Sequence, residues 1–178
     1  MSGLRVIGLA GWSGAGKTTL LAKLIPLLVG RGVRVATLKH AHHAFDLDHP
    51  GKDSHIHRQA GASEVIVSSS RRWAQIREVA EGEEAVLADL LRRLAPKGLA
   101  IVEGFKREAH PKLEVYRAAN GREPLHGGDP RIVGIASDRP FPDAGRPVVH
   151  LDDVAGIADL VLARAEPLDV VLTRLEHP

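Results

Sequence analysis

Residues 11–18 carry a glycine-rich pattern that is typical of phosphate-binding loops, G-W-S-G-A-G-K-T. A glycine, four intervening residues and then Gly-Lys-Thr match the Walker A pattern. The glycines let backbone N–H groups turn toward phosphate oxygens, Lys17 can reach the β- and γ-phosphates, and the Thr18 hydroxyl can bind Mg²⁺. The alternative is an ordinary glycine-rich turn that caps a helix. The residues predicted to bind nucleotide here are Gly11, Ser13, Gly14, Ala15, Gly16, Lys17, Thr18 and Thr19.

Glu103 is the predicted acidic partner of this loop. It follows the apolar run 99–102 (LAIV), and an acid at the end of such a strand commonly holds the Mg²⁺ of a Walker-type site. We therefore predict that Thr18 and Glu103 bind the metal and that Lys17 and Glu103 carry the catalytic roles. A surface glutamate at a strand end is the alternative. Three other acids compete for the metal or for a reactive water, namely Asp46, Asp48 and Asp53.

A histidine-rich stretch begins after the second expected strand and extends into the next helix, and it includes His40, His42, His43, His49, His55 and His57. Such histidines can bind a metal ion, although adjacent ones rarely point to one centre. A second hypothesis is recognition of an anion by Lys39, His40 and Lys52, because ligands bind at the carboxyl ends of parallel strands. A solvated loop is the third, so the sequence leaves the role of this stretch open.

Asp138 is the predicted contact to a nucleotide base. It lies just beyond the apolar run 131–136 (RIVGIA), at the expected ligand end of a strand. A carboxylate there can accept hydrogen bonds from guanine N1–H and the exocyclic amino group, whereas adenine lacks that pair of donors. The alternative is that Asp138 only begins the Ser-Asp-Arg-Pro turn.

The phosphate loop needs a strand before it and a helix after it, and the sequence supplies both. Residues 4–10 (LRVIGLA) are almost entirely apolar, and 19–30 has leucines at helical spacing, with Pro26 expected to kink the helix. A second strand at 33–38 completes a unit that implies parallel strands and a right-handed crossover. Further strands are expected at 64–69, 73–77, 99–102, 131–136 and 148–151, with a half-exposed strand at 112–117 and helices at 54–60, 83–94 and 154–165.

This alternation predicts an α/β fold with a mainly parallel sheet and helices on both faces. Residues 1–178 lack a linker or repeat, which predicts a single P-loop nucleotide-binding domain. The absence of cysteine excludes disulfides, thiol catalysis and Cys-ligated metals. Aromatic residues make up 3% and the formal charge is +2, so we expect no nucleic-acid partner. Without a targeting segment or an 18-residue apolar stretch, we expect a cytoplasmic protein with no membrane partner.

Several segments taken together resemble the MobB family of molybdopterin-guanine dinucleotide biosynthesis accessory proteins. They are 11–19 (GWSGAGKTT), 39–43 (KHAHH), 52–54 (KDS), 60–62 (AGA), 102–106 (VEGFK) and 111–115 (PKLEV), so the resemblance covers about residues 4–140. It implies a P-loop NTPase fold, GTP and Mg²⁺ as cofactors, and a homodimer. It also implies an accessory role beside the nucleotidyltransferase MobA, which attaches GMP to molybdopterin, together with weak GTPase activity.

The resemblance assigns Gly14, Gly16, Lys17, Thr18 and Thr19 to phosphate and Mg²⁺, and Glu103 less firmly. It leaves open whether molybdopterin binds to this chain itself, and whether GTP hydrolysis has a physiological role. A small-molecule kinase built on the same phosphate loop is the alternative function. Such a kinase usually closes an arginine-bearing lid over the transferred phosphate, and Arg71, Arg72 and Arg107 are the candidates here.

Overall fold

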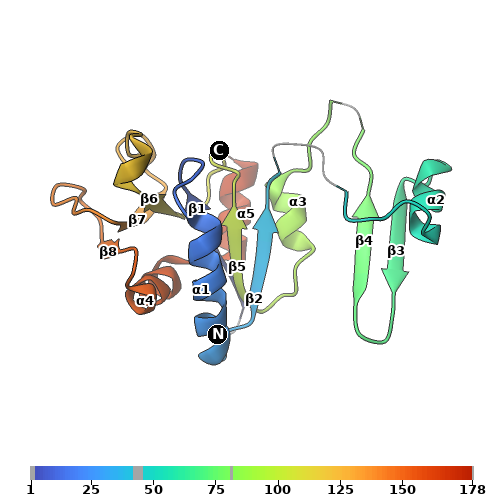
Figure 1. The fold of residues 1–178 in the computed structure, drawn as a ribbon, viewed down its shortest axis with the longest axis horizontal. Helices are drawn as coiled ribbons and strands as arrows, with labels where there is room; N and C mark the ends of the chain where they lie inside the picture. The colour runs from blue at the N-terminus through green and yellow to red at the C-terminus, as the bar shows by residue number, and fades with distance from the viewer. Residues whose placement is uncertain (1–2, 42–45, 81, 178) are drawn as a thin grey trace. The chain divides into compact units, whose positions relative to one another are not determined.

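The computed structural model describes residues 3–41, 46–80 and 82–177 (Figure 1). The chain divides into two compact units. The larger consists of Met1–His40 and Leu87–Pro178, and the smaller is Ala41–Val86. The phosphate loop, Glu103 and Asp138 all belong to the larger unit. The sequence-based expectation of one nucleotide-binding domain over 1–178 stays a prediction.

A mainly parallel sheet forms the centre of the larger unit, as the sequence predicts. Its strands run side by side in the order β2-β5-β1-β6-β7-β8, all parallel, while β9 pairs with β1 in the antiparallel sense (Figure 1). Strands adjacent in the sheet are separated in sequence by helices or long loops, as parallel pairing requires. The bounds are β1 Leu4–Ala10, β2 Val35–Lys39, β5 Gly98–Glu103, β6 Lys112–Tyr116, β7 Ile132–Ser137, β8 Val148–His150 and β9 Glu166–Pro167.

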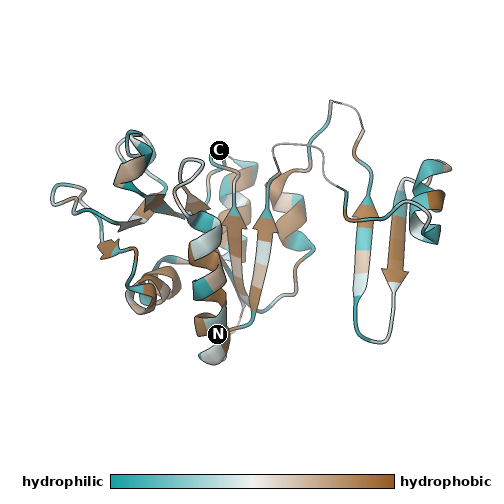
Figure 2. Cartoon of the chain, in the orientation of Figure 1, coloured by the Kyte–Doolittle hydropathy of each residue, from teal (hydrophilic) through white to brown (hydrophobic). Residues whose placement is uncertain are grey.

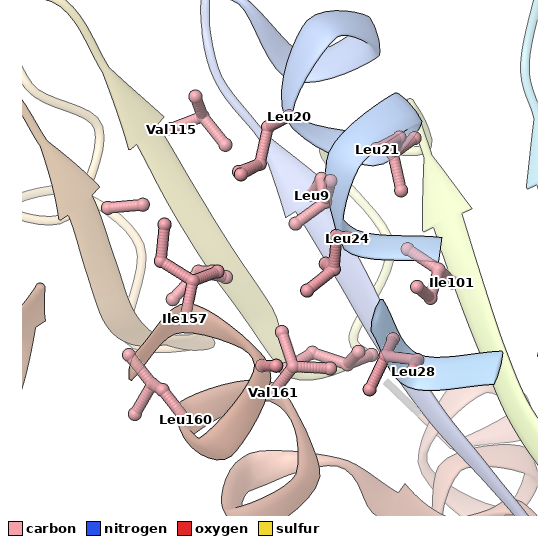
Figure 3. Packing of buried hydrophobic residues seen from close by; sticks show 14 of the residues in the cluster. Leu9, Leu20, Leu21, Leu24, Leu28, Ile101, Val115, Ile157, Leu160 and Val161 are labelled. Atoms are coloured by element: carbon pink, nitrogen blue, oxygen red, sulfur yellow. The ribbon is translucent and has the colours of Figure 1, made fainter. Parts of the chain in front are cut away.

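Helices cover the sheet on both faces, which confirms the predicted architecture. Ile7 and Leu9 of β1 pack with α1 (Lys17–Gly30) and α4 (Val154–Arg164) on one face, while Val6 packs with α3 (Leu87–Arg92) and α5 (Leu168–Glu176) on the other. This alternation follows from the two-residue period of a strand. Figure 3 shows Leu24 of α1 and Val161 of α4 as members of one packed cluster. Figure 2 shows that β5 and α4 are apolar along most of their length.

Strand β6 differs from its sequence-based prediction. The alternating pattern of 112–117 predicts a half-exposed strand, but every residue of β6 is buried. Leu113 and Val115 enter the core. Lys112 and Glu114 form hydrogen bonds with the loop that follows β6. The helix expected at 83–94 is also shorter, because α3 begins only at Leu87. Helix α5 and strand β9 were not predicted.

The smaller unit contains a helix and a β-hairpin, α2 (Asp53–Gln59), β3 (Glu64–Ser68) and β4 (Trp73–Arg77), at positions close to the predicted ones. Several of its apolar side chains face solvent, and Ile66 and Trp73 of the hairpin are 63% and 67% exposed. Among the described residues of the whole chain, no helix combines the length and apolar character that crossing a membrane requires.

Candidate nucleotide-binding site

Three neighbouring strands end at the same edge of the sheet and bring the predicted site residues together. Leu9 of β1 is in register with Glu103 of β5, which is in turn in register with Lys39 of β2. The phosphate loop begins directly after β1 and leads into α1 (Figure 1). In open α/β sheets, ligands bind at the carboxyl ends of the strands. The sheet therefore gathers one lysine, one glutamate and the glycine-rich loop at the edge where a ligand is expected.

The backbone of the loop depends on its glycines. Gly14 and Gly16 have φ values of +80° and +93°, a region that residues other than glycine rarely adopt. A Cβ atom on Gly11 would lie 2.5 Å from the carbonyl oxygen of Val115 in β6. Gly16 is also the residue before the first turn of α1, where its carbonyl accepts the N–H of Leu20 at 2.8 Å. The loop thus leads into the positive end of a helix, which favours an anion.

Lys17 folds back across this loop. Its Nζ donates to the carbonyl oxygens of Gly11 at 3.0 Å and Trp12 at 3.1 Å. Partial burial lowers the pKa of Lys17, and the positive charges of Lys106 and Lys39 lower it further against the opposing effect of Glu103. A phosphate group would relieve this cost, because it offers the ammonium charged acceptors in place of neutral carbonyls.

Thr18 and Glu103 lie next to each other, as the predicted metal site requires. The Thr18 hydroxyl donates to Oε1 of Glu103 over 3.4 Å. Both are oxygen donors of the kind that Mg²⁺ prefers, and Mg²⁺ usually takes only one or two protein ligands beside phosphates and waters. The pair therefore fits a magnesium ion that completes its coordination with a bound triphosphate.

The rival acids belong to the smaller unit, where two of them have a structural role. Asp46 accepts from Nη1 of Arg58 at 2.8 Å, and the same nitrogen lies 3.4 Å from Asp48. The hydrogen bond from Arg58 lowers the pKa of Asp46. Asp48 also accepts from the Ser54 hydroxyl at 2.8 Å. These contacts join the segment before α2 to the helix, so the two carboxylates are already engaged. Asp53 is the first residue of α2.

Asp138 lies at the end of β7, but a backbone group already uses one of its oxygens. Oδ1 accepts from the N–H of Ala118 at 2.8 Å, and Oδ2 lies 3.9 Å from Nη1 of Arg117. Asn120, two residues after Ala118, donates through Nδ2 to the carbonyl of Ser13 in the phosphate loop at 3.2 Å. Neither Arg117 nor Asn120 belongs to the Walker pattern, so the sequence alone does not point to them. The role of Asp138 in base recognition stays a prediction.

The histidine-rich stretch is described only in part. The backbone N–H of His40 donates to the carbonyl of Glu103 at 2.9 Å, and its ring lies 4.9 Å from that of Phe105. His42 and His43 fall outside the described residues. Across the ranges that the structure covers, no group of three or more His, Asp or Glu side chains is arranged to hold a metal ion.

Comparison with known proteins gives the family. A family model described as MobB, molybdopterin guanine dinucleotide synthesis protein B, matches residues 6–138. The chain belongs to the MobB family. It is 42% identical over 160 residues to the molybdopterin-guanine dinucleotide biosynthesis adapter protein of Escherichia coli K12, a match that covers 88% of this chain and 91% of that protein. All the predicted phosphate and magnesium residues lie inside the MobB match.

A second relative supports this assignment by sequence, and a solved structure supports the fold. The MobB-family adapter of the same description from Haemophilus influenzae is 36% identical over 159 residues, covering 88% of this chain and 86% of its own length. The crystal structure of Bacillus subtilis MobB aligns with a TM-score of 0.67 at 21% identity, covering 91% of this chain and 98% of that one. At that identity the structural match supports the fold, and the family rests on the sequence matches.

Proposed function

We propose that this MobB-family chain is a GTP-binding adapter in molybdopterin-guanine dinucleotide synthesis, with weak Mg²⁺-dependent GTPase activity. Family membership gives it an accessory role in molybdenum cofactor biosynthesis. The observation that carries the nucleotide proposal is the joint placement of Lys17, Thr18 and Glu103 around a helix N-terminus. The choice of GTP rests on the family resemblance.

In this proposal the loop backbone and Lys17 hold the triphosphate. N–H groups of residues 13–19 bind the phosphate oxygens, and Lys17 exchanges the carbonyls of Gly11 and Trp12 for β- and γ-phosphate oxygens. Thr18 and Glu103 would hold Mg²⁺, which would supply positive charge to neutralise the phosphates. In hydrolysis, the oxygen of a water molecule forms a bond to the γ-phosphorus. The bond between the γ-phosphorus and the β–γ bridging oxygen breaks, giving GDP and phosphate.

The proposed protein partners are the nucleotidyltransferase MobA and a second copy of this chain. Molybdopterin is the proposed small-molecule partner. The apolar side chains exposed on the smaller unit support a homodimer. Ile66, Val67 and Trp73 lie on the hairpin and Ile56 lies on α2, and burying such residues between two copies is favourable. Light scattering on the whole chain tests this, because a monomeric mass at micromolar concentration would contradict it. The cytoplasmic location stays a prediction.

The deciding experiment compares GTP and ATP affinity in Mg²⁺ by calorimetry, and repeats the GTP titration with MobA and molybdopterin. We expect GTP to bind and Lys17→Ala to weaken it by about ten- to a hundredfold, because a charged hydrogen bond is lost. Lys23→Ala is the matched control, since Lys23 is an exposed lysine of the same helix. Equal GTP affinity in Lys17→Ala would contradict the proposal. ATP consumption that depends on an added acceptor would instead favour the kinase.

A further inference from the structure

Arg117 is the first residue after β6 and lies directly beside the phosphate loop. Strand β6 neighbours β1 on the side opposite β5, so Arg117 and Glu103 approach the loop from two sides. The Nη2 atom of Arg117 lies 3.5 Å from the point that a Cβ atom on Gly16 would occupy, and Nε lies 3.9 Å from it. A guanidinium group therefore sits over the residue that precedes Lys17, at the N-terminus of α1.

Contacts on both sides fix the short segment that begins with Arg117. The Ala118 N–H donates to Asp138 at 2.8 Å, which ties the start of the segment to β7. Asn120 donates to Ser13 at 3.2 Å, which ties its end to the phosphate loop. The segment includes one turn of 3₁₀ helix, Ala118–Asn120. These bonds set the distance between the Arg117 backbone and the loop, so the position of the guanidinium does not depend on its own contacts alone.

The guanidinium itself is only weakly neutralised. Its Nη1 atom lies 3.9 Å from Oδ2 of Asp138, which is long for a charged hydrogen bond. Within the described part of the chain, Asp138 is the carboxylate that lies within 4 Å of it. The Arg117 side chain is 44% exposed. A forked donor with spare N–H groups thus faces solvent beside a loop built to bind anions, where a planar guanidinium suits phosphate oxygens.

We propose that Arg117 is a second cationic contact to the phosphate chain of the bound nucleotide, and that Asp138 acts on it as a positioning residue. This inference rests on the proposed nucleotide function. Lys17 would bind the phosphates from inside the loop, and Arg117 would bind them from the β6 side. Asp138 fixes Ala118 through one oxygen, and its other oxygen, 3.9 Å from Nη1 of Arg117, favours a guanidinium position beside the loop.

Two nearby cations provide a contrast. Nζ of Lys106 lies 5.2 Å from the ring centre of Trp12, and Cζ of Arg122 lies 5.5 Å from it. Both charges thus associate with the indole of Trp12 in the loop. Arg122 is therefore a matched control, because it is another exposed arginine beside the same loop but contacts an aromatic face.

The test measures GTP affinity of the whole chain in Mg²⁺ by calorimetry. Arg117→Ala should weaken binding by about ten- to a hundredfold, Arg117→Lys should recover part of that loss, and Arg122→Ala should stay close to wild type. The affinity of Arg117→Ala should also fall less steeply with added salt, since one charge contact is missing. The unfolding temperature of the variants should match that of the wild type. If Arg117 had a purely structural role, its replacement would lower the unfolding temperature.

The outcomes separate the two proposals. Loss of affinity in Lys17→Ala together with wild-type affinity in Arg117→Ala would overturn the Arg117 assignment and leave the nucleotide function standing. Absence of GTP binding in the wild-type chain would overturn the proposed function itself. If Arg117→Ala does not fold, Arg117→Lys and Arg117→Gln decide, because a phosphate contact predicts that the lysine variant binds GTP more tightly than the glutamine variant.

Discussion

The Thr18 hydroxyl and the Glu103 carboxylate face each other across 3.4 Å, joining the first turn of α1 to the end of β5. An O–H···O hydrogen bond is usually near 2.7–2.8 Å, so this contact is long and weak. The two groups are brought together by the register of β1 and β5 rather than by their own attraction. An ion that binds to both can therefore displace the bond at little cost.

Replacing Glu103 tests this arrangement. Glu103→Gln keeps the shape and removes the charge that would hold Mg²⁺, so we expect Mg²⁺-dependent GTP hydrolysis to fall by about ten- to a hundredfold. Nucleotide binding without metal should stay the same or tighten, because repulsion of phosphate decreases. Phosphate release measured over a series of Mg²⁺ concentrations checks the first effect, and calorimetry in EDTA checks the second.

Glu108→Gln is the control for this variant, since it removes an acid from the loop that follows Glu103. An unchanged hydrolysis rate in Glu103→Gln at every Mg²⁺ concentration would reject Glu103 as the metal-binding acid. Asp53→Asn would then be the next variant to make, because Asp46 and Asp48 are already bound to Arg58.

The elements around the phosphate loop could be predicted because their signals are local. A run of apolar residues marks β1, and the Walker spacing fixes where α1 begins. Strand β6 could not be predicted correctly in the same way. Its alternation of Lys112 and Glu114 with apolar residues is the pattern of a half-exposed strand, and their partners Asp129 and His126 lie on a loop beyond the strand. Only the tertiary fold buries them.

The candidate site shows the same division. Lys17, Thr18 and Glu103 follow from a motif and a strand end, and the sheet brings all three together. Arg117 and Asn120 reach the loop because β6 lies next to β1, and strand order cannot be read from spacing along the chain. A sequence signal for them would have required the position of β6 in the sheet.

Removing one partner of the ion pair between the buried Lys112 and the half-buried Asp129 should lower stability strongly. Their charged atoms lie 2.9 Å apart, and the Lys112 side chain is 2% exposed. Asp129→Asn keeps an oxygen to accept the Arg131 N–H but leaves a buried ammonium without a counter-charge. We expect it to lower the free energy of unfolding in urea by about 3–5 kcal/mol.

Two further variants complete that measurement. The double variant Lys112→Met with Asp129→Asn should recover much of the loss, since it removes the buried charge as well as its partner. Asp143→Asn, which changes an exposed acid in a later loop, should have little effect. A loss below about 1 kcal/mol in Asp129→Asn would mean that water reaches Lys112 and replaces the carboxylate.

His110 should make the fold sensitive to acid. It is fully buried, neither ring nitrogen has a partner among the described residues, and a Cβ atom on Gly8 would lie 2.3 Å from its Nε2. Burial, helped by the charge of Lys112, lowers the pKa of His110 to about 3. Between that value and an unfolded pKa near 6.5, the unfolded chain binds a proton that the native chain rejects. Stability is therefore lost as the pH falls below about 6.5.

A comparison of two pH values measures this effect. From pH 7 to pH 5, His110 should cost the native state about 2 kcal/mol. His110→Leu removes the titrating group, so its urea unfolding free energy should fall less over that interval than the wild-type value does. His150→Leu, at an exposed histidine of β8, should retain the wild-type pH dependence. Equal pH dependence in wild type and His110→Leu would show that His110 can be protonated in the native state.

Replacing Asp138 and measuring affinity for several nucleotides distinguishes a role in base recognition from a role in positioning Arg117. Asp138→Asn keeps an oxygen for the Ala118 N–H and removes the charge that faces Arg117. If Asp138 binds guanine, the variant loses about ten- to a hundredfold in GTP affinity and gains preference for XTP, because the new NH₂ suits the xanthine carbonyl. ATP stays poor in that case. If Asp138 positions Arg117, affinities for GTP, XTP and ATP change by the same factor, because the phosphates are common to all three.

A double variant decides between these outcomes. In the background of Arg117→Ala, a positioning residue has nothing left to position, so Asp138→Asn should have no further effect on GTP affinity. A base contact is independent of Arg117, and its loss should then add to that of Arg117→Ala. The geometry favours the first outcome, because Oδ1 of Asp138 already accepts a backbone N–H and Oδ2 lies toward the guanidinium. Calorimetry with GTP and XTP on the wild type, both single variants and the double variant completes the cycle. Additive losses with a shift toward XTP would return Asp138 to the base, and wild-type affinity for both nucleotides in Asp138→Asn would leave it as a turn residue that caps the 3₁₀ helix.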